Sequence, residues 1–197
     1  HYATLTRNTV ISLLPNCDVY ITDWRNARDV PYSAGKFDIE DYTKYLIDFY
    51  TILSPKINVI AVCQPVPLAL AAAAFTSKNS PKFNPASLTL IGGPIDPDAN
   101  PTEVTDFGHR ASMETLENTV TMPVGLNYKG VGREVYPGSI QLASFIAMNQ
   151  ETHNKAFLNQ IEREASGNAL EHDRHNKFYD EYLAVMDMTA EFYLSTV

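Results

Sequence analysis

The sequence predicts an α/β protein built around a parallel sheet, because strand-like apolar runs alternate with helical patterns in its first half. "INVIAV" at 57–62 is almost continuously apolar, and "SLTLIG" at 87–92 is a second run of this kind. Such runs are typical of parallel strands that are covered on both faces. A third predicted strand is "DVYITDW" at 18–24.

Helical patterns separate these strands. Residues 2–14 place apolar side chains on one side of a predicted helix that ends at Pro15. Asp38 is a typical N-cap, and the helix after it repeats apolar residues with three-four spacing as far as Leu53. A further helix over about 65–75 follows the first apolar run directly, so strand and helix alternate with short connections.

The second half of the chain has a different pattern. It predicts helices and loops but no strand, with a long loop bearing Gly and Pro at 122–138. The helices are expected near 139–148, 150–165, 173–186 and 188–197. Because helical insertions on a parallel sheet usually form a cap, we predict a partial α/β core over 1–98 and a mostly helical cap or lid over 99–197.

Composition excludes several classes of function. The net charge is −8 and no cluster of Lys or Arg is present, so we expect no nucleic-acid partner. No apolar run reaches the 18 residues that a membrane span needs. Two cysteines do not make a disulfide framework, which favours a reducing cytosol. The chain begins at His1 without an initiator Met, as a fragment or a processed product does, so the lack of a signal peptide is uninformative.

Cys63 stands where the strand at 57–62 turns into a helix. A nucleophile on a sharp strand-to-helix turn is the nucleophile elbow of α/β-hydrolases, usually G-x-S-x-G; here it reads Ala61-Val62-Cys63-Gln64-Pro65. The helix N-terminus favours a thiolate, and the backbone N–H of Gln64 is expected to face a developing oxyanion. Since both glycines and the serine are replaced, the pattern alone leaves a buried structural cysteine equally open.

Five segments carry a family resemblance: "HYATLTRNTVISLLP", "DVYITDWRNAR", "VIAVCQP", "LIGGPID" and "FYDEYLAVMDMTAEFYLSTV". Together they resemble the intracellular poly(3-hydroxybutyrate) (PHB) depolymerases, which are cytosolic α/β-hydrolases with cysteine in place of the elbow serine. The segment at 19–28 is also similar to the polyester synthases, whose elbow is G-x-C-x-G. Ala61 and Pro65 favour the depolymerases.

The resemblance implies that Cys63 attacks the polyester carbonyl and forms an acyl-thioester that water releases. The substrate is then the PHB granule or its 3-hydroxybutyrate oligomers, in the cytoplasm, with no cofactor. The oxyanion loop of the family matches His1–Thr4, so His1 is expected beside the site in a supporting role. Two alternatives are a polyester synthase-like acyltransferase and a non-catalytic granule-binding protein. Loss of activity on alkylation of Cys63 separates the enzymes from the binding protein.

The rest of a catalytic triad is harder to locate. No histidine after Cys63 follows a predicted strand; these are His109, His153, His172 and His175. Asp96 and Asp98 are better placed for an acid, but the resemblance puts both acid and base beyond Val197 and a middle strand before His1. We therefore expect a central fragment of the full fold, inactive and poorly folded by itself.

Other residues have two interpretations each. His172 and His175 flank Asp173, and this spacing favours the start of a surface helix over a metal site. Cys17 is expected to be structural and not to pair with Cys63. Trp24, Tyr128 and Tyr136 are candidates for lining an apolar polyester, the alternative being ordinary packing in the core, as for Phe145.

Overall fold

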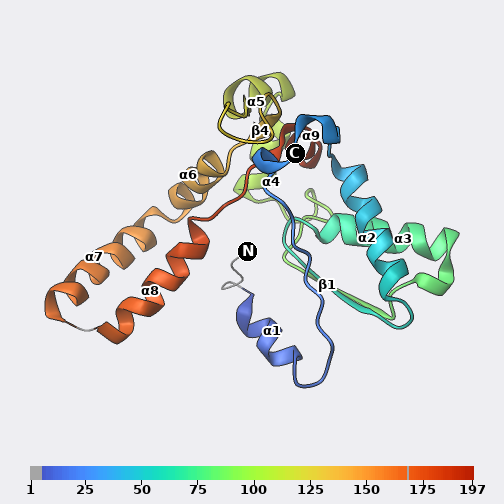
Figure 1. Cartoon of the computed structure of the whole chain (residues 1–197), viewed down its shortest axis with the longest axis horizontal. Helices are drawn as coiled ribbons and strands as arrows, with labels where there is room; N and C mark the ends of the chain where they lie inside the picture. The colour runs from blue at the N-terminus through green and yellow to red at the C-terminus, as the bar shows by residue number, and fades with distance from the viewer. Residues whose placement is uncertain (1–5, 168) are drawn as a thin grey trace. The chain divides into compact units, whose positions relative to one another are not determined.

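The computed structural model describes residues 6–167 and 169–197, and the chain divides into two compact units. Unit 1 consists of His1–Ala34 and Val120–Met188, and unit 2 of Gly35–Thr119 and Thr189–Val197. Figure 1 shows the course of the chain with the labels of its elements. Among the described residues, no helix is both long enough and apolar enough to cross a membrane.

Unit 2 contains a parallel pair of strands, β1 (Asn58–Val62) and β2 (Ser87–Ile91). Asn58 lies opposite Ser87 and Val62 opposite Ile91, so the two strands end together. Both strands predicted here are confirmed. Because parallel strands with matched ends deliver their following loops to one edge, the residues after Val62 and Ile91 are neighbours.

The faces of this sheet differ from the sequence-based expectation. Ile60, Val62 and Ile91 are each 41–48% exposed, and only Ala61 of the two strands is buried. The prediction that both faces are covered is therefore wrong for the described structure. The physical reason is that two short strands offer little surface for helices to pack on, so side chains at the sheet margins stay accessible.

Two helices form the interior of unit 2: α2 (Ile39–Leu53) and α3 (Val66–Asn79). The hydroxyl of Tyr50 donates to the carbonyl of Ala69 at 3.2 Å, and burial raises the pKa of Tyr50 to about 12. Alanines on α3 allow the helices to approach closely. The buried side chains of this interior are Leu46, Tyr50, Val66, Leu68, Ala69 and Ala72. The other helical elements of the unit are η3 (Pro81–Phe83), α4 (Glu103–Arg110), α5 (Met113–Val120) and α9 (Ala190–Thr196).

The start of α2 confirms the predicted cap. The Asp38 carboxylate accepts hydrogen bonds from the N–H groups of Glu40 (2.9 Å) and Asp41 (3.2 Å), and Asp41 accepts from the N–H of Asp38. This reciprocal arrangement is a capping box. Lys36 Nζ lies 2.8 Å from Asp38 Oδ2, and this hydrogen bond lowers the pKa of Asp38.

We expect Asp38→Ala to cost about 1 kcal/mol of unfolding free energy at neutral pH. Because the folded-state pKa of Asp38 is lowered, its stabilisation is present above the unfolded-state pKa and is lost as the pH falls through the folded-state value. Thermal unfolding of both proteins at pH 7 and pH 3 measures this, and the difference between them should shrink in acid. Asp48→Ala, on the exposed side of α2, is the control. An equal difference at both pH values would contradict the expectation.

Unit 1 begins with α1 (Arg7–Leu13), which lies inside the helix predicted over 2–14; residues 1–5, and so His1, lie outside the described residues. The strand predicted at 18–24 is not formed. Tyr20 and Ile21 are 72% and 61% exposed, and the segment pairs with no strand of the described chain. The physical reason is that aromatic and β-branched residues favour a strand only where a neighbouring edge accepts their backbone hydrogen bonds.

A small sheet takes two of its strands from the segment predicted as loop, 122–138, and the third from the start of the helix predicted over 188–197. Its strands, in the order β3-β4-β5, are β3 (Met122–Pro123), β4 (Glu134–Tyr136) and β5 (Met188–Thr189). β3 and β4 are antiparallel, and Ala27, Val124 and Val135 form a buried cluster beside them. The expectation of no strand in the second half is wrong, because strands of two or three residues are too short to show a period of two.

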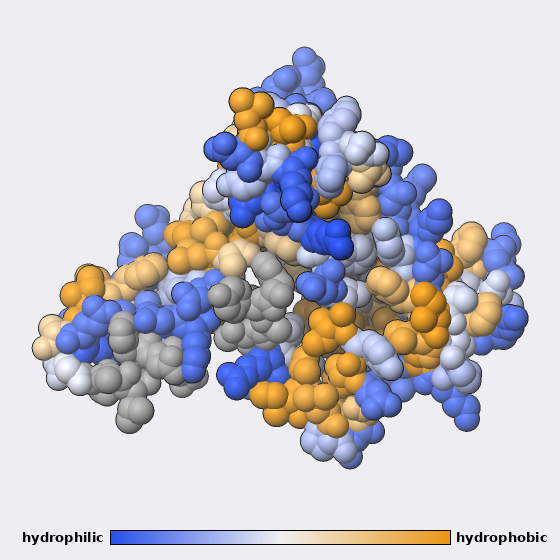
Figure 2. All heavy atoms as spheres, in the orientation of Figure 1, coloured by the Kyte–Doolittle hydropathy of each residue, from blue (hydrophilic) through white to orange (hydrophobic). Residues whose placement is uncertain are grey.

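Three of the helices predicted in the second half of the chain are present in unit 1. They are α6 (Gly138–Met148), α7 (Gln150–Ser166) and α8 (Ala169–Tyr182), which starts and ends earlier than predicted. Helices α7 and α8 lie side by side (Figure 1). Figure 2 shows apolar residues over α6 and α7. The exposed apolar side chains of these two helices include Phe145, Met148, Phe157, Leu158 and Ile161.

Candidate active site

Cys63 occupies a strained turn between β1 and α3. Its φ is +65°, a left-handed conformation that costs a residue with a side chain about 1–2 kcal/mol. Its N–H donates to the carbonyl of Ile91 at 2.8 Å, and its carbonyl accepts from the N–H of Val66 at 3.0 Å. These two bonds hold the backbone, one from the neighbouring strand and one from the helix start. The Cys63 residue itself is exposed, so it is not a buried structural cysteine.

The residues after Cys63 suit a sharp entry into α3. Pro65 is the N-cap, with φ of −73°, and Pro67 lies in the first helical turn, where no backbone donor is needed. Gln64 is half-buried and stands between the thiol and the helix. The turn is therefore compact without the two glycines of the usual elbow motif.

Two glycines follow directly after β2, at the point where the chain passes the turn at Cys63. Gly92 has a φ of +60°, and a Cβ on Gly93 would overlap Cβ of Val66. This contact means that the segment after β2 passes directly against the first residue of α3. Sequence reasoning assigned no role to this pair, although "GG" directly after a strand indicates a close backbone approach.

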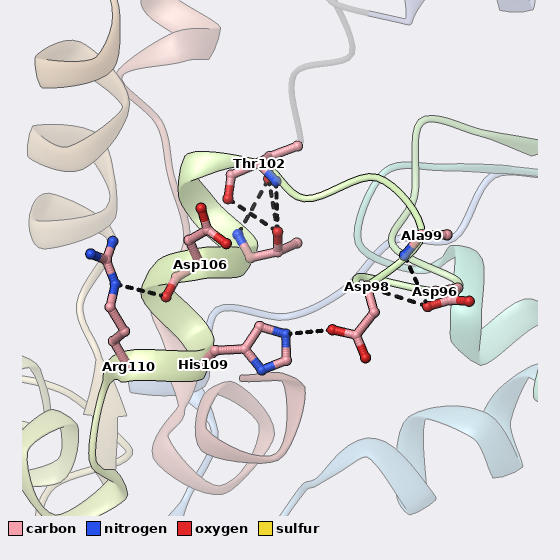
Figure 3. A network of polar contacts seen from close by, with 8 residues as sticks. Asp96, Asp98, Ala99, Thr102, Asp106, His109 and Arg110 are labelled. Atoms are coloured by element: carbon pink, nitrogen blue, oxygen red, sulfur yellow. Dashed lines mark hydrogen bonds and ion pairs between the residues drawn. The ribbon is translucent and has the colours of Figure 1, made fainter.

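The histidine nearest to Cys63 in the sequence, His109, belongs to a surface network of unit 2. Its Nε2 lies 3.1 Å from Oδ1 of Asp98, and both side chains are more than half exposed. Asp96 Oδ1 accepts from the N–H groups of Asp98 and Ala99, as Figure 3 shows. An exposed ion pair of this kind contributes little stability. Asp96 and Asp98 thus order the loop that leads into α4.

The other described histidines lie in unit 1, in the hairpin of α7 and α8. His153 is buried, and its Nδ1 lies 2.9 Å from the Tyr179 hydroxyl. His175 packs its ring against Tyr179 at a centroid distance of 4.6 Å. Burial raises the pKa of Tyr179. The side chain of His172 lies outside the described ones, and the remaining described residues contain no group of three or more His, Cys, Asp or Glu that could hold a metal.

Unit 1 also contains a groove of about 890 Å³. Its walls come from residues within 23–29, 122–129, 135–142 and 183–187. Trp24 and Tyr128, two of the predicted lining residues, lie on these walls. Tyr136 does not: it is buried beside the groove, and burial raises its pKa.

Hydrogen bonds from backbone and side-chain groups hold the groove walls together. The N–H of Gly138 donates to Asp187 Oδ1 at 2.8 Å, and the Gln141 side chain donates to the carbonyls of Tyr136 and Met186. The N–H of Gly130 donates to the carbonyl of Arg28 at 2.8 Å. Segments distant in the sequence are thereby fixed against one another within unit 1.

Comparison with known families identifies a match in the second half of the chain. Residues 92–197, more than half of the chain, match the family model described as "PHB de-polymerase C-terminus". No curated protein and no solved structure matches the chain at a significant level. The matched segment begins directly after β2, so it includes the groove residues from 122 onward and the α7–α8 hairpin, whereas Cys63 lies before it.

Proposed function

Because the chain belongs to the PHB depolymerase C-terminus family, we propose that it takes part in the hydrolysis of ester bonds in intracellular poly(3-hydroxybutyrate), with Cys63 as the nucleophile. The observation that carries this proposal is the left-handed turn at Cys63, which presents a free, exposed thiol between a strand and a helix N-terminus. Backbone strain of this kind concentrates at functional sites. The same turn is the geometry of a nucleophile elbow.

The proposed reaction has two steps. The sulfur of Cys63 forms a bond to the ester carbonyl carbon, and the ester C–O bond breaks, so that the polymer alcohol leaves with the thiol proton. Water then attacks the acyl-thioester, giving a carboxylic acid and restoring the thiol. The backbone N–H of Gln64 and the N-terminus of α3 are the proposed stabilisers of the negative charge on the carbonyl oxygen. None of the described histidines is assigned as the base.

The fold and location are proposed on the same basis. An α/β-hydrolase-like core over 1–98 with a helical cap over 99–197 is supported by the parallel β1–β2 pair and by the sharp connection from β1 to α3. We propose action on granules or on 3-hydroxybutyrate oligomers in the cytoplasm, and membership of the PHB depolymerase C-terminus family supports a polyester substrate. The exposed apolar side chains on α6 and α7 are suited to contact with a water-insoluble polyester.

Trapping of the acyl-thioester tests the proposal without a complete triad, because an activated ester has a leaving group that needs no protonation. The protein is incubated with p-nitrophenyl 3-hydroxybutyrate, quenched in acid and mapped by mass spectrometry. We expect the acyl group on Cys63.

The two free, exposed cysteines provide a matched control. Cys17→Ala should retain the acyl label, and Cys63→Ala should lose it. Label on Cys17 alone, or label that persists in Cys63→Ala, would show that Cys63 is not the nucleophile.

A further inference from the structure

We propose that the groove of unit 1 binds the free carboxylate end of a 3-hydroxyalkanoate chain, and that Arg28 is the residue that recognises it. The identification of the ligand as a 3-hydroxyalkanoate rests on the proposed function, whereas the presence of an anion-recognising group rests on the groove itself. The site would make the protein prefer polymer ends and short oligomers that carry a carboxylate over those that do not.

Arg28 has a donor that the protein does not use. The side chain is half-buried, its Nε is inaccessible to solvent, and no acceptor for this atom is found among the described residues. Arg28 lines the groove through its other atoms, so an anion bound there compensates the charge of the guanidinium without reaching Nε, which lowers the cost of leaving that donor buried. The guanidinium carbon lies 4.9 Å from the centre of the Tyr128 ring, and this stacking fixes the guanidinium plane. A carboxylate is the acceptor that such a fork matches with two parallel hydrogen bonds.

The other charges on the groove walls favour Arg28 over its neighbours. Arg25 and Lys129 are exposed, as are Asp23 and Asp29, so water screens them. Asp187 is half-buried, but one of its carboxylate oxygens accepts from the N–H of Gly138. Among the charged side chains on the groove walls, Arg28 is therefore the half-buried cation, and its Nε has no acceptor among the described residues.

The rest of the wall suits a chain of short esters. Leu142, Leu183 and Met186 contribute apolar surface, and the groove volume of about 890 Å³ lies in the range of small-molecule sites. A 3-hydroxybutyrate oligomer carries a methyl group on each unit and a charge only at its carboxyl end. Apolar contact along the groove combined with one cation matches this distribution.

Trp24 provides a direct readout, because it is the only tryptophan in the sequence and lies on the groove wall. The probe is the linear trimer of (R)-3-hydroxybutyrate, titrated into the full chain and followed by tryptophan fluorescence. The methyl ester of the same trimer is the comparison. We expect the acid to bind at least about tenfold more tightly than the ester, since hydrogen bonds to charged groups are the strong ones. Equal affinities, or no binding of either compound, would overturn the proposal.

Arg28→Gln is expected to remove the preference for the acid, while Arg25→Gln should change the affinity less than about twofold. An equal effect of the two substitutions would point to general charge and overturn the assignment of Arg28. The comparison of acid and ester in the unsubstituted chain stands even if Arg28→Gln does not fold. The titration is repeated with Cys63→Ala. If this variant still binds the acid more tightly than the ester, the groove recognises the carboxylate independently of Cys63. Failure of the acylation experiment would then contradict the proposed nucleophile and leave the proposed groove site standing.

Discussion

Replacing Cys63 by glycine is expected to stabilise the protein by about 1 kcal/mol while abolishing its acylation by activated esters. The φ of +65° at Cys63 is comfortable for glycine and unfavourable for any residue with a Cβ. Relief of roughly 1–2 kcal/mol is partly offset by the greater freedom of glycine in the unfolded chain, roughly 0.5–1 kcal/mol. The gain corresponds to a rise in Tm of roughly 2–4 °C for a chain of this size.

The opposite changes in stability and acylation are what distinguish a functional cysteine from a structural one. A cysteine retained for packing would lose contacts on truncation, and stability would fall. An exposed thiol at a strained turn has few contacts to lose, so the strain is retained for what the thiol does. Thermal unfolding and mass spectrometry of the same Cys63→Gly preparation measure both quantities.

Lys56 provides the control for this experiment. It is the other described residue with a side chain in the left-handed region, at φ of +69°, and it is exposed. Lys56→Gly should give a similar gain in stability and leave the acylation of Cys63 unchanged. A Cys63→Gly protein that is less stable than the parent, or one that still accepts the acyl group, would contradict the interpretation of this turn.

The strands and helices that the sequence predicted well are those whose pattern depends on local chemistry. The run at 57–62 and its partner at 87–92 form β1 and β2, and Asp38 caps α2 through its own carboxylate. The two strands are long enough for their apolar pattern to be recognised, and the helix cap depends on one specific side chain. In both cases local preferences decide the structure. The position of Cys63 in a tight turn follows in the same way from the residues on either side of it.

The features that were missed depend on contacts between distant segments. Tyr20 and Ile21 have strand propensity, but no described strand pairs with them. The short β3 and β4 exist because Met122 meets Val135 across a turn, which no local period reveals. Arg28 was not a candidate for the same reason: its stacking on Tyr128 brings together residues about a hundred positions apart.

Gly138→Ala, at the start of α6, is expected to lower the unfolding free energy by about 3 kcal/mol. A Cβ at this position would overlap the carbonyl oxygen of Val185 and lie 2.8 Å from its carbonyl carbon. The obstacle is backbone, so a side chain cannot rotate away to make room. The N–H of Gly138 also donates to Asp187 at 2.8 Å, so a shift that relieves the clash strains this bond as well. Thermal unfolding should show a Tm lower by roughly 6–12 °C.

Gly125→Ala is the matched control for this substitution, because Gly125 also lies on the groove wall but has open space where a Cβ would stand and no left-handed φ. Its Tm should stay within about 1 °C of the parent, as for an ordinary surface change. In Gly138→Ala the segment 183–187 must move away from α6, so the affinity for the trimer read through Trp24 should fall together with stability. Unfolding of Gly138→Ala at the parent temperature would mean that α6 and Val185 do not approach as closely as described, and that this wall of the groove is not held by their contact.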